Sequence, residues 1–156
     1  MRNVVIAITS VLSLMVASAL AADNRNSVSV TCSVAIEQPK QGANVGGDGN
    51  VSGRVKKPEG TRAWALARKK GISGWWPQGG GPLEVNDDGT FDAWITYGED
   101  RDKGAFEVAV IVVDAEVNKL LTSWVDRTNQ SGRYPPIGFP NVHDGCPVEK
   151  IIVNKQ

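Results

Sequence analysis

The sequence predicts a mainly β protein, a sandwich of two sheets with one short helix near the C-terminus. Several short segments alternate apolar and polar residues, which is the period of a half-buried strand. Turn residues separate these segments at short intervals, and only one segment has the period of an amphipathic helix. Spacing of this kind is typical of a β-sandwich. The alternative is a small barrel of the oligosaccharide- and oligonucleotide-binding type, an OB-like barrel, which also tolerates one helix.

The N-terminal residues have the pattern of an export signal. Arg2 precedes an apolar run over residues 4–16, and an A-x-A cleavage site ends at Ala21. We therefore expect residues 1–21 to be a signal peptide and the protein to be secreted or periplasmic. No later stretch has the roughly 20 apolar residues that a transmembrane helix needs. Removing the signal peptide from the 156 residues leaves 135, a length that suits one domain over residues 22–156.

The two cysteines, Cys32 and Cys146, predict a disulfide bond. They are the only cysteines in the chain, so only one intramolecular pairing exists, and an even number of cysteines in an exported protein favours pairing. The alternative is a reactive cysteine assisted by His143, but this needs a free thiol, which an oxidising compartment disfavours. We expect the bond to join the first and last strands of the fold.

The first half of the chain predicts three strands. Residues 27–36 alternate strictly, with Cys32 on the apolar side, and residues 50–55 form a short strand after a polar loop rich in glycine and asparagine. Residues 56–60 have the proline and glycine of a turn. Residues 62–69 alternate again, with alanines on one face and larger side chains on the other.

The larger side chains of this third strand include Trp64 and Leu66, and we expect their face to be the core face. The next two strands are predicted over residues 82–85 and 90–97. They flank the sequence Asn-Asp-Asp-Gly, which is a β-hairpin signal.

The last third of the chain predicts a central strand, a helix and a final strand. Residues 105–114 are almost continuously apolar, the pattern of a strand covered on both faces. Apolar residues in 115–128 recur at helical spacing, which predicts that a helix covers one of those faces, with Asp114 as its N-cap. Three prolines make residues 131–145 an irregular connector, and residues 147–153 predict the last strand.

Part of the chain resembles a known kind of module. Over about residues 47–114 it is similar to a small immunoglobulin-like β-sandwich module of bacterial secreted proteins. The resemblance implies an immunoglobulin-like sandwich and an accessory or binding role. The N-terminal strand, the C-terminal helix and the two cysteines depart from that module. The segments that carry the resemblance are GNVSGRVKKPEG, RAWALAR, GWWPQGG, NDDGTFDAWI and GAFEVAVIVVD.

The sequence lacks the residues that most catalytic and metal sites need. His143 is the only histidine, and no nucleophile motif surrounds it, so we expect a surface or capping role rather than that of a general base. Zinc takes three or four Cys or His ligands, and the acidic runs 86–89 and 99–102 lack the spacing of a calcium loop. We therefore predict no metal, no cofactor and no enzymatic activity. A glycosidase, which needs only two carboxylates, is a third choice.

Charge is balanced overall but polarised along the chain. Without Arg2 there are 16 Lys and Arg against 17 Asp and Glu, so no nucleic acid partner is expected. Residues 54–70 carry a net charge of +6 and residues 84–102 a net charge of −6. If these segments lie on adjacent strands, they neutralise each other. Otherwise the basic segment could bind an anionic partner or a second copy, and raising the salt concentration would weaken that binding.

The five tryptophans divide into two groups. Trp64 and Trp124 lie on stripes predicted to be core, whereas Trp75, Trp76 and Trp94 are candidates for a surface that stacks on sugar rings or on a protein. Neighbouring residues of an extended chain point to opposite faces. In the segment GWWPQGGG, residues 74–81, one tryptophan is therefore expected to be buried and the other to be accessible.

These observations predict a secreted, non-enzymatic binding or interaction module that recognises a protein or a glycan through an aromatic and basic surface. The alternatives are a carbohydrate-binding domain and a small exported inhibitor of a cell-wall or secreted enzyme. No residue pattern predicts an oligomeric state. The candidate binding residues are Trp75, Trp76, Trp94, Arg68, Lys69 and Lys70.

Overall fold

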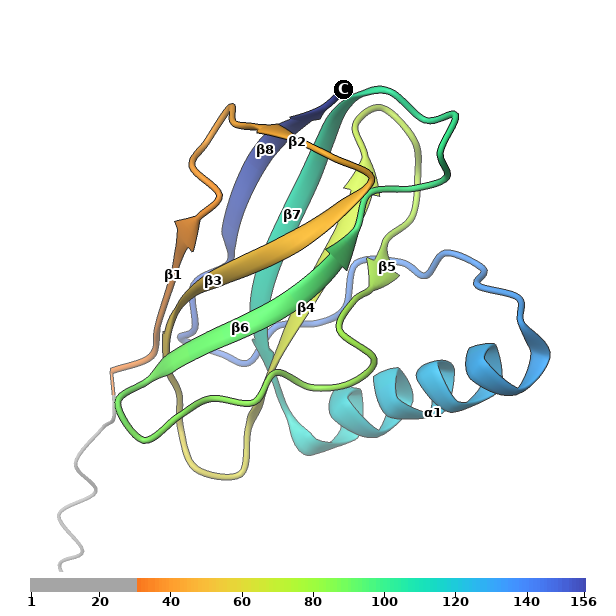
Figure 1. The fold of residues 1–156 in the computed structure, drawn as a ribbon. Coiled ribbons are helices and arrows are strands. Elements are labelled where there is room, and N and C mark those ends of the chain that lie inside the picture. Colours follow the sequence, from red (N-terminus) through yellow and green to blue (C-terminus); the bar gives the residue numbers. More distant parts are fainter. Residues whose placement is uncertain (1–30) are drawn as a thin grey trace, which may run out of the picture.

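The structure, a computed structural model, describes residues 31–156 as two β-sheets with one helix packed against the larger sheet (Figure 1). The predicted signal peptide and residues 27–30 of the predicted first strand lie outside the described residues. The elements are β1 (Ser33–Gln38), β2 (Asn44–Val45), β3 (Asp48–Lys56), β4 (Arg62–Lys69), β5 (Trp76–Pro77), β6 (Thr90–Thr96), β7 (Gly104–Val113), α1 (Ala115–Ser131) and β8 (Glu149–Lys155).

The strands form two sheets that pack face to face. One sheet has three strands in the order β1-β3-β6, and the other has five strands in the order β2-β8-β7-β4-β5. Neighbouring strands are antiparallel, except that β2 runs parallel to β8. The predicted turn after β3 carries the chain from the smaller sheet to the larger one. The prediction of a mainly β, two-sheet fold with one helix is confirmed, and the arrangement is consistent with a β-sandwich.

The core between the sheets uses the small face of β4. Ala63, Ala65 and Ala67 lie in one buried cluster with Phe91 and Ile95 of β6. Because alanine side chains are short, they leave space for the larger side chains of the facing sheet, which keeps the interior closely packed.

The opposite face of β4 is also buried, so the prediction of a single core face was wrong. Trp64 and Leu66 lie in a second cluster with Leu121 and Trp124 of α1, and the Trp64 indole donates a hydrogen bond to Oδ1 of Asn118 at 3.0 Å. Alternation along a strand separates its two faces but does not reveal what covers each of them.

The central strand and the helix lie as predicted. β7 occupies the middle of the five-stranded sheet, and its two faces are buried in the inter-sheet core and under α1. The helix continues three residues beyond the predicted end at residue 128, to Ser131. It ends where Gly132 adopts a left-handed φ of 66° and donates its N–H to the Thr128 carbonyl at 2.8 Å.

Asp114 occupies the predicted N-cap position, but its side chain does not cap the helix. Its carboxylate instead contacts Nδ1 of His143. The backbone N–H of His143 also donates to the carbonyl of Val112 at 2.8 Å. This histidine therefore attaches the connector to the start of the helix.

Several strand boundaries differ from the prediction. β3 has nine residues where six were predicted, β8 begins two residues later than predicted, and the two-residue strand β2 was not predicted. The predicted turn at residues 86–89 forms, because the Asn86 N–H donates to the Thr90 carbonyl at 2.9 Å and Val85 forms an isolated antiparallel bridge with Phe91, but residues 82–85 do not form the predicted strand. The N–H of Leu83 donates to the carbonyl of Ala63 at 2.8 Å, which attaches this segment to the other sheet.

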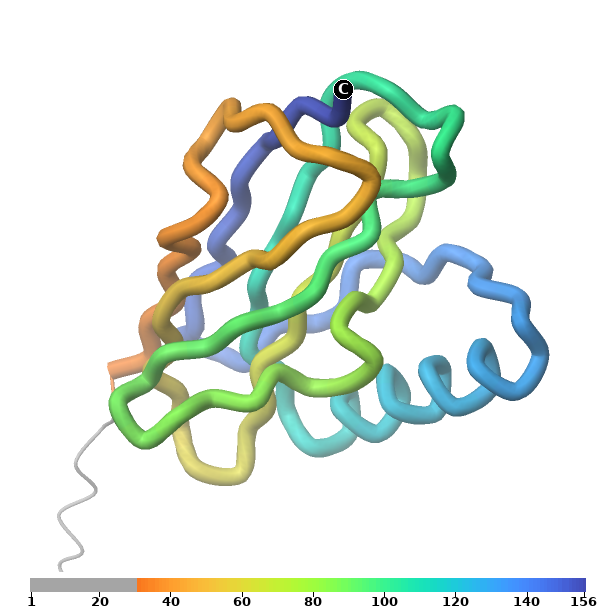
Figure 2. The backbone as a smooth tube through the Cα atoms, viewed as in Figure 1, coloured from red at the N-terminus to blue at the C-terminus, as the bar shows by residue number. Residues whose placement is uncertain are grey.

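The predicted disulfide joins Cys32 and Cys146, whose Cα atoms lie 5.0 Å apart. Cys32 precedes β1 and Cys146 precedes β8, so the bond connects the three-stranded sheet to the five-stranded sheet. Figure 2 shows how the connector between α1 and β8 passes behind the five-stranded sheet before the chain enters β8. Disulfides are typical of proteins that fold in oxidising compartments.

Lys155 offers a test of the link between β8 and the β6–β7 loop. Only 4% of this residue is exposed, and its ammonium donates to the carbonyls of Tyr97 at 2.8 Å and Glu99 at 2.6 Å. The substitution Lys155→Met removes the ammonium group and with it both hydrogen bonds. It is expected to lower the free energy of unfolding, measured by urea denaturation, by about 2 kcal/mol. The control Lys119→Met, on the exposed side of α1, should change it by less than about 0.5 kcal/mol. Equal stabilities of the two variants would contradict this role.

Candidate functional site

The first tryptophan of the segment GWWPQGGG is buried. Trp75 is 3% exposed and forms two backbone hydrogen bonds with Ile137 of the connector, at 2.8 and 2.9 Å. Its ring packs edge-on against Phe139 with centroids 5.1 Å apart, and the Arg68 guanidinium lies 4.5 Å from its ring centroid. Trp75 therefore anchors the connector to the five-stranded sheet.

The second tryptophan, Trp76, is half-buried and lines a cleft. Its indole N–H donates to the carbonyl of Tyr134 at 2.7 Å. The Tyr134 ring lies edge-on to Trp124 of α1, with centroids 6.2 Å apart, and its hydroxyl bonds to Oδ1 of Asn129 at 3.4 Å. These contacts hold Trp76 and Tyr134 in place relative to the helix. Only one tryptophan of the pair is buried, as the alternation predicted.

The cleft has a volume of about 1000 Å³ and lies between the ends of β4 and β6, strand β5, the β6–β7 loop and the C-terminal part of α1. Five of its lining residues are aromatic. Phe106 and Trp124 are buried, whereas Trp76, Trp94 and Tyr134 are at least partly accessible. Trp94 is 59% exposed and Tyr134 is 54% exposed. Trp94 lies on the outer face of β6, opposite the face that contributes to the core. Within residues 31–156 its indole N–H has no hydrogen-bond partner.

Gln78 joins two sides of the cleft. Its backbone N–H donates to the carbonyl of Ala65 at 2.9 Å, and its side-chain oxygen accepts from the N–H of Thr96 at 2.9 Å. Its side-chain nitrogen donates to the carbonyl of Trp76 at 3.1 Å. A single amide side chain therefore bridges β5 and the end of β6 across the open edge between the sheets.

The charges in the cleft cancel. The charged lining residues are Arg68, Lys69, Glu99 and Asp102. The Lys69 ammonium lies 3.0 Å from the carboxylate of Asp102, and the Arg68 guanidinium contacts Glu107. Hydrogen bonds from the Glu99 N–H and from Lys69 hold the pKa of Asp102 below its ordinary value, so this carboxylate stays charged to lower pH than usual.

The basic and acidic segments meet at two places. Only residues 54–56 of β3 belong to the basic segment, and Arg54 lies opposite Thr90 of β6. The rest of the basic segment includes β4 of the other sheet, where the Lys69–Asp102 ion pair joins it to the acidic segment. Arg54 of the basic segment instead forms an ion pair with Glu37 of β1 at 3.2 Å.

Four of the six predicted binding residues line the cleft. They are Trp76, Trp94, Arg68 and Lys69. Trp75 lies in the cluster under the helix. Lys70 is exposed at the end of β4 and is not among the lining residues. Sequence reasoning missed Tyr134 and Gln78, because both lie in irregular segments where no periodic pattern indicates which residues the fold brings together.

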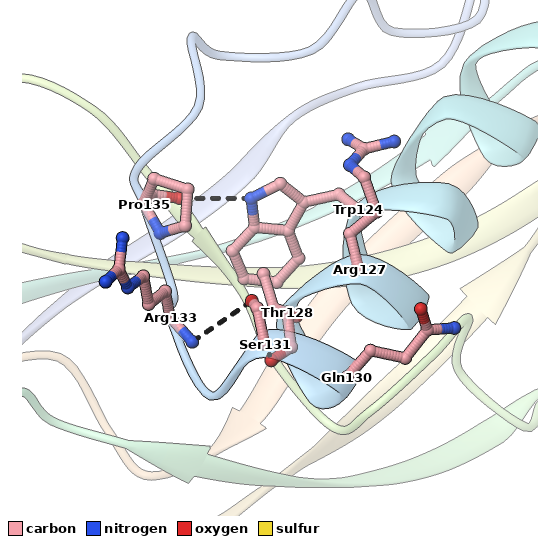
Figure 3. Close-up of a pocket in the computed structure, with 7 residues that line it drawn as sticks. All are labelled: Trp124, Arg127, Thr128, Gln130, Ser131, Arg133 and Pro135. Carbon is pink, nitrogen blue, oxygen red and sulfur yellow. Dashed lines mark hydrogen bonds between the residues drawn. The ribbon is translucent and has the colours of Figure 1, made fainter.

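A second, smaller hollow of about 460 Å³ lies beside the C-terminal end of α1 (Figure 3). In it the Trp124 indole donates to the carbonyl of Pro135 at 3.0 Å, and the N–H of Arg133 donates to Oγ of Ser131 at 3.3 Å. The guanidinium groups of Arg127 and Arg133 extend in different directions and do not converge on one point (Figure 3). The hollow therefore lacks the paired donors that would hold an anion.

Two general features of the described part of the chain bear on its chemistry. Residues 31–156 contain no group of three or more His, Cys, Asp or Glu residues that could hold a metal ion. No helix within the same range is long and apolar enough to cross a membrane.

Neither a scan against protein-family models nor a search of curated proteins finds a match to the chain.

Proposed function

We propose that the protein is a secreted, non-enzymatic binding module whose ligand occupies the cleft lined by Trp76, Trp94 and Tyr134. The observation that carries this proposal is the exposure of Trp94 at 59% beside a cleft of about 1000 Å³. Ligand sites are typically concave, with volumes of about 300–1000 Å³, and they combine aromatic side chains with a few fixed polar groups. Exposed large aromatic residues that gather at one place are typical of binding surfaces.

The fold and the disulfide support this proposal. The strands β3, β4, β6 and β7 all lie within the segment that resembles an immunoglobulin-like module, and they form most of the two sheets. Modules of that kind are generally accessory or binding units. The disulfide between Cys32 and Cys146 agrees with export through the predicted signal peptide.

The positions of the titratable groups favour binding over catalysis. His143 contacts Asp114 at the N-terminal end of α1, whereas the helix residues that line the cleft begin at Trp124, about 15 Å further along the helix. The two carboxylates in the cleft, Glu99 and Asp102, belong to the same loop, and each forms an ion pair. A glycosidase instead places its two carboxylates on opposite sides of the bond that is cleaved.

The substitution Trp94→Ala tests the proposal. Because Trp94 is exposed, we expect the free energy of unfolding to change by less than about 0.5 kcal/mol while ligand binding is lost. The measurement is retention of immobilised protein by three classes of probe: uncharged polysaccharides, anionic polysaccharides and a library of extended peptides. Leu120→Ala is the matched control, because Leu120 is 69% exposed on α1 outside the cleft. Failure of all three classes to bind the unmodified protein, or binding that Trp94→Ala leaves unchanged, would contradict the proposal.

A further inference from the structure

We infer that the ligand of the cleft is an uncharged glycan, held by stacking on aromatic rings and by hydrogen bonds rather than by ionic attraction. This inference rests on the proposed function, because it names the ligand class for the same cleft. It departs from the sequence-based expectation of a basic surface that could attract an anionic partner.

The first argument for an uncharged ligand comes from the ion pairs of the cleft. The four charged lining residues, two basic and two acidic, have a net charge of zero. Lys69 and Asp102 pair at 3.0 Å, and Arg68 pairs with Glu107. A strongly anionic ligand would have to separate these pairs or approach Glu99 and Asp102, and both alternatives oppose its binding. An uncharged ligand meets no such opposition.

The second argument, which favours a glycan, comes from the aromatic residues of the cleft. The rings of Trp94 and Tyr134 are more than half exposed, and flat rings of this kind can pack against the C–H faces of pyranose sugars. Trp76 and Tyr134 are held by the hydrogen bond between them and by the contact of Tyr134 with Trp124. Because their positions are set before the ligand arrives, binding costs little ordering of side chains.

The polar groups of the cleft fit hydroxyl groups. Ion-paired side chains such as Lys69 and Asp102 are held in fixed positions, and the carboxylate retains acceptor capacity beyond its bonds to Lys69 and the Glu99 N–H. Sugar hydroxyls both donate and accept, so they can bond to either member of such a pair without separating it. The indole N–H of Trp94, which has no partner within residues 31–156, adds a donor at the exposed side of the cleft.

The sheet edges beside the cleft are partly closed to an extended peptide. Peptides that add a strand to a sheet need free N–H and C=O groups along an edge. At the edge of the five-stranded sheet, β5 has only two residues, and one of them, Pro77, lacks an N–H. At the edge of the three-stranded sheet, β6 ends at Thr96, whose N–H already donates to Gln78 Oε1 at 2.9 Å. Gln78 therefore occupies the cleft end of the β6 edge, and the peptide library tests whether the rest of that edge accepts a strand.

The experiment is a calorimetric titration of the mature, disulfide-bonded protein with single probes. The uncharged probes are linear oligosaccharides of glucose, xylose and mannose. The charged probes are oligogalacturonate and heparin fragments, and a library of extended peptides is the third class. We expect at least one uncharged oligosaccharide to bind, with a dissociation constant that changes less than about twofold between about 50 and about 500 mM NaCl.

Three variants of the cleft complete the experiment. Trp94→Ala and Tyr134→Ala should each weaken binding of the uncharged oligosaccharide by at least about tenfold. Trp94→Phe should retain most of the affinity because it keeps a flat ring, and Leu120→Ala should bind like the unmodified protein.

The remaining outcomes separate this inference from the proposed function. Trp94-dependent binding of anionic oligosaccharides alone, with a steep loss of affinity as salt rises, would overturn the uncharged-glycan inference and leave the binding module in place. Binding of peptides alone, if it depends on Trp94, would also overturn the uncharged-glycan inference and leave the binding module in place. If no probe of any class binds the unmodified protein, both the inference and the proposed function fail.

Discussion

Gly53→Ala is expected to lower the free energy of unfolding by about 3 kcal/mol or more. Gly53 lies in β3, opposite Ile36 of β1. A Cβ atom added at this position would overlap the carbonyl oxygen of Ala35 and would stand 3.0 Å from Cε1 of Phe91. The first contact is with backbone and the second with a fully buried ring, so neither neighbour can move away without disturbing the sheet or the core.

The same strand contains a matched control for this prediction. A Cβ atom added at Gly49 would have no heavy atom within 4 Å, so Gly49→Ala should leave the stability unchanged or raise it by a few tenths of a kcal/mol. Urea denaturation of the two variants side by side measures the difference between them. If Gly53→Ala were as stable as Gly49→Ala, β1 would not approach β3 as closely as the structure shows.

Removing the disulfide is expected to have an effect of similar size. The bond joins residues 114 positions apart, and closing a loop of that length restricts the unfolded chain by about 4–5 kcal/mol in the chain-entropy treatment. The double substitution Cys32→Ser and Cys146→Ser should therefore lower the free energy of unfolding by about 4 kcal/mol and the melting temperature by about 10–20 °C.

Reduction of the unmodified protein provides the control for the disulfide prediction. Treatment with a thiol reductant should reproduce the melting temperature of the double variant and should leave that variant unaffected. A loss of stability below about 1 kcal/mol on removal of the bond would show that the two sheets hold together without it.

Local sequence patterns were enough to predict the elements in which one regular pattern of burial runs along the whole element. β7 was predicted from its continuous apolar residues because a strand buried on both faces needs apolar side chains on each. The helix was predicted from its 3.6-residue period, although its end was not, because Gly132 determines the end through a left-handed conformation. The turn at residues 86–89 forms as predicted, but residues 82–85 do not form a strand because Leu83 bonds to β4 rather than pairing along β6, a long-range contact that a turn signal does not indicate.

The residues of the cleft were also predicted only in part from the sequence. The sequence indicated Trp76, Trp94, Arg68 and Lys69 because aromatic residues and arginine are enriched at binding surfaces and a basic segment can attract an anionic partner. It did not indicate Tyr134, because this residue reaches the cleft only through the path of the connector. It also did not indicate that Arg68 and Lys69 are paired with Glu107 and Asp102, which changes the expected ligand from an anion to an uncharged one.

The sequence by itself determined the class of fold, the single disulfide pairing and the burial of one tryptophan in the segment GWWPQGGG. These follow from residue period and from cysteine number, which are local or combinatorial properties. Only the tertiary structure decided that Trp75 is the anchor and that Trp76 lines a cleft with Trp94 and Tyr134. The reason is physical: two neighbouring tryptophans have the same intrinsic preference for burial, so contacts from distant segments decide which one is buried, and here Ile137 and Phe139 of the connector cover Trp75.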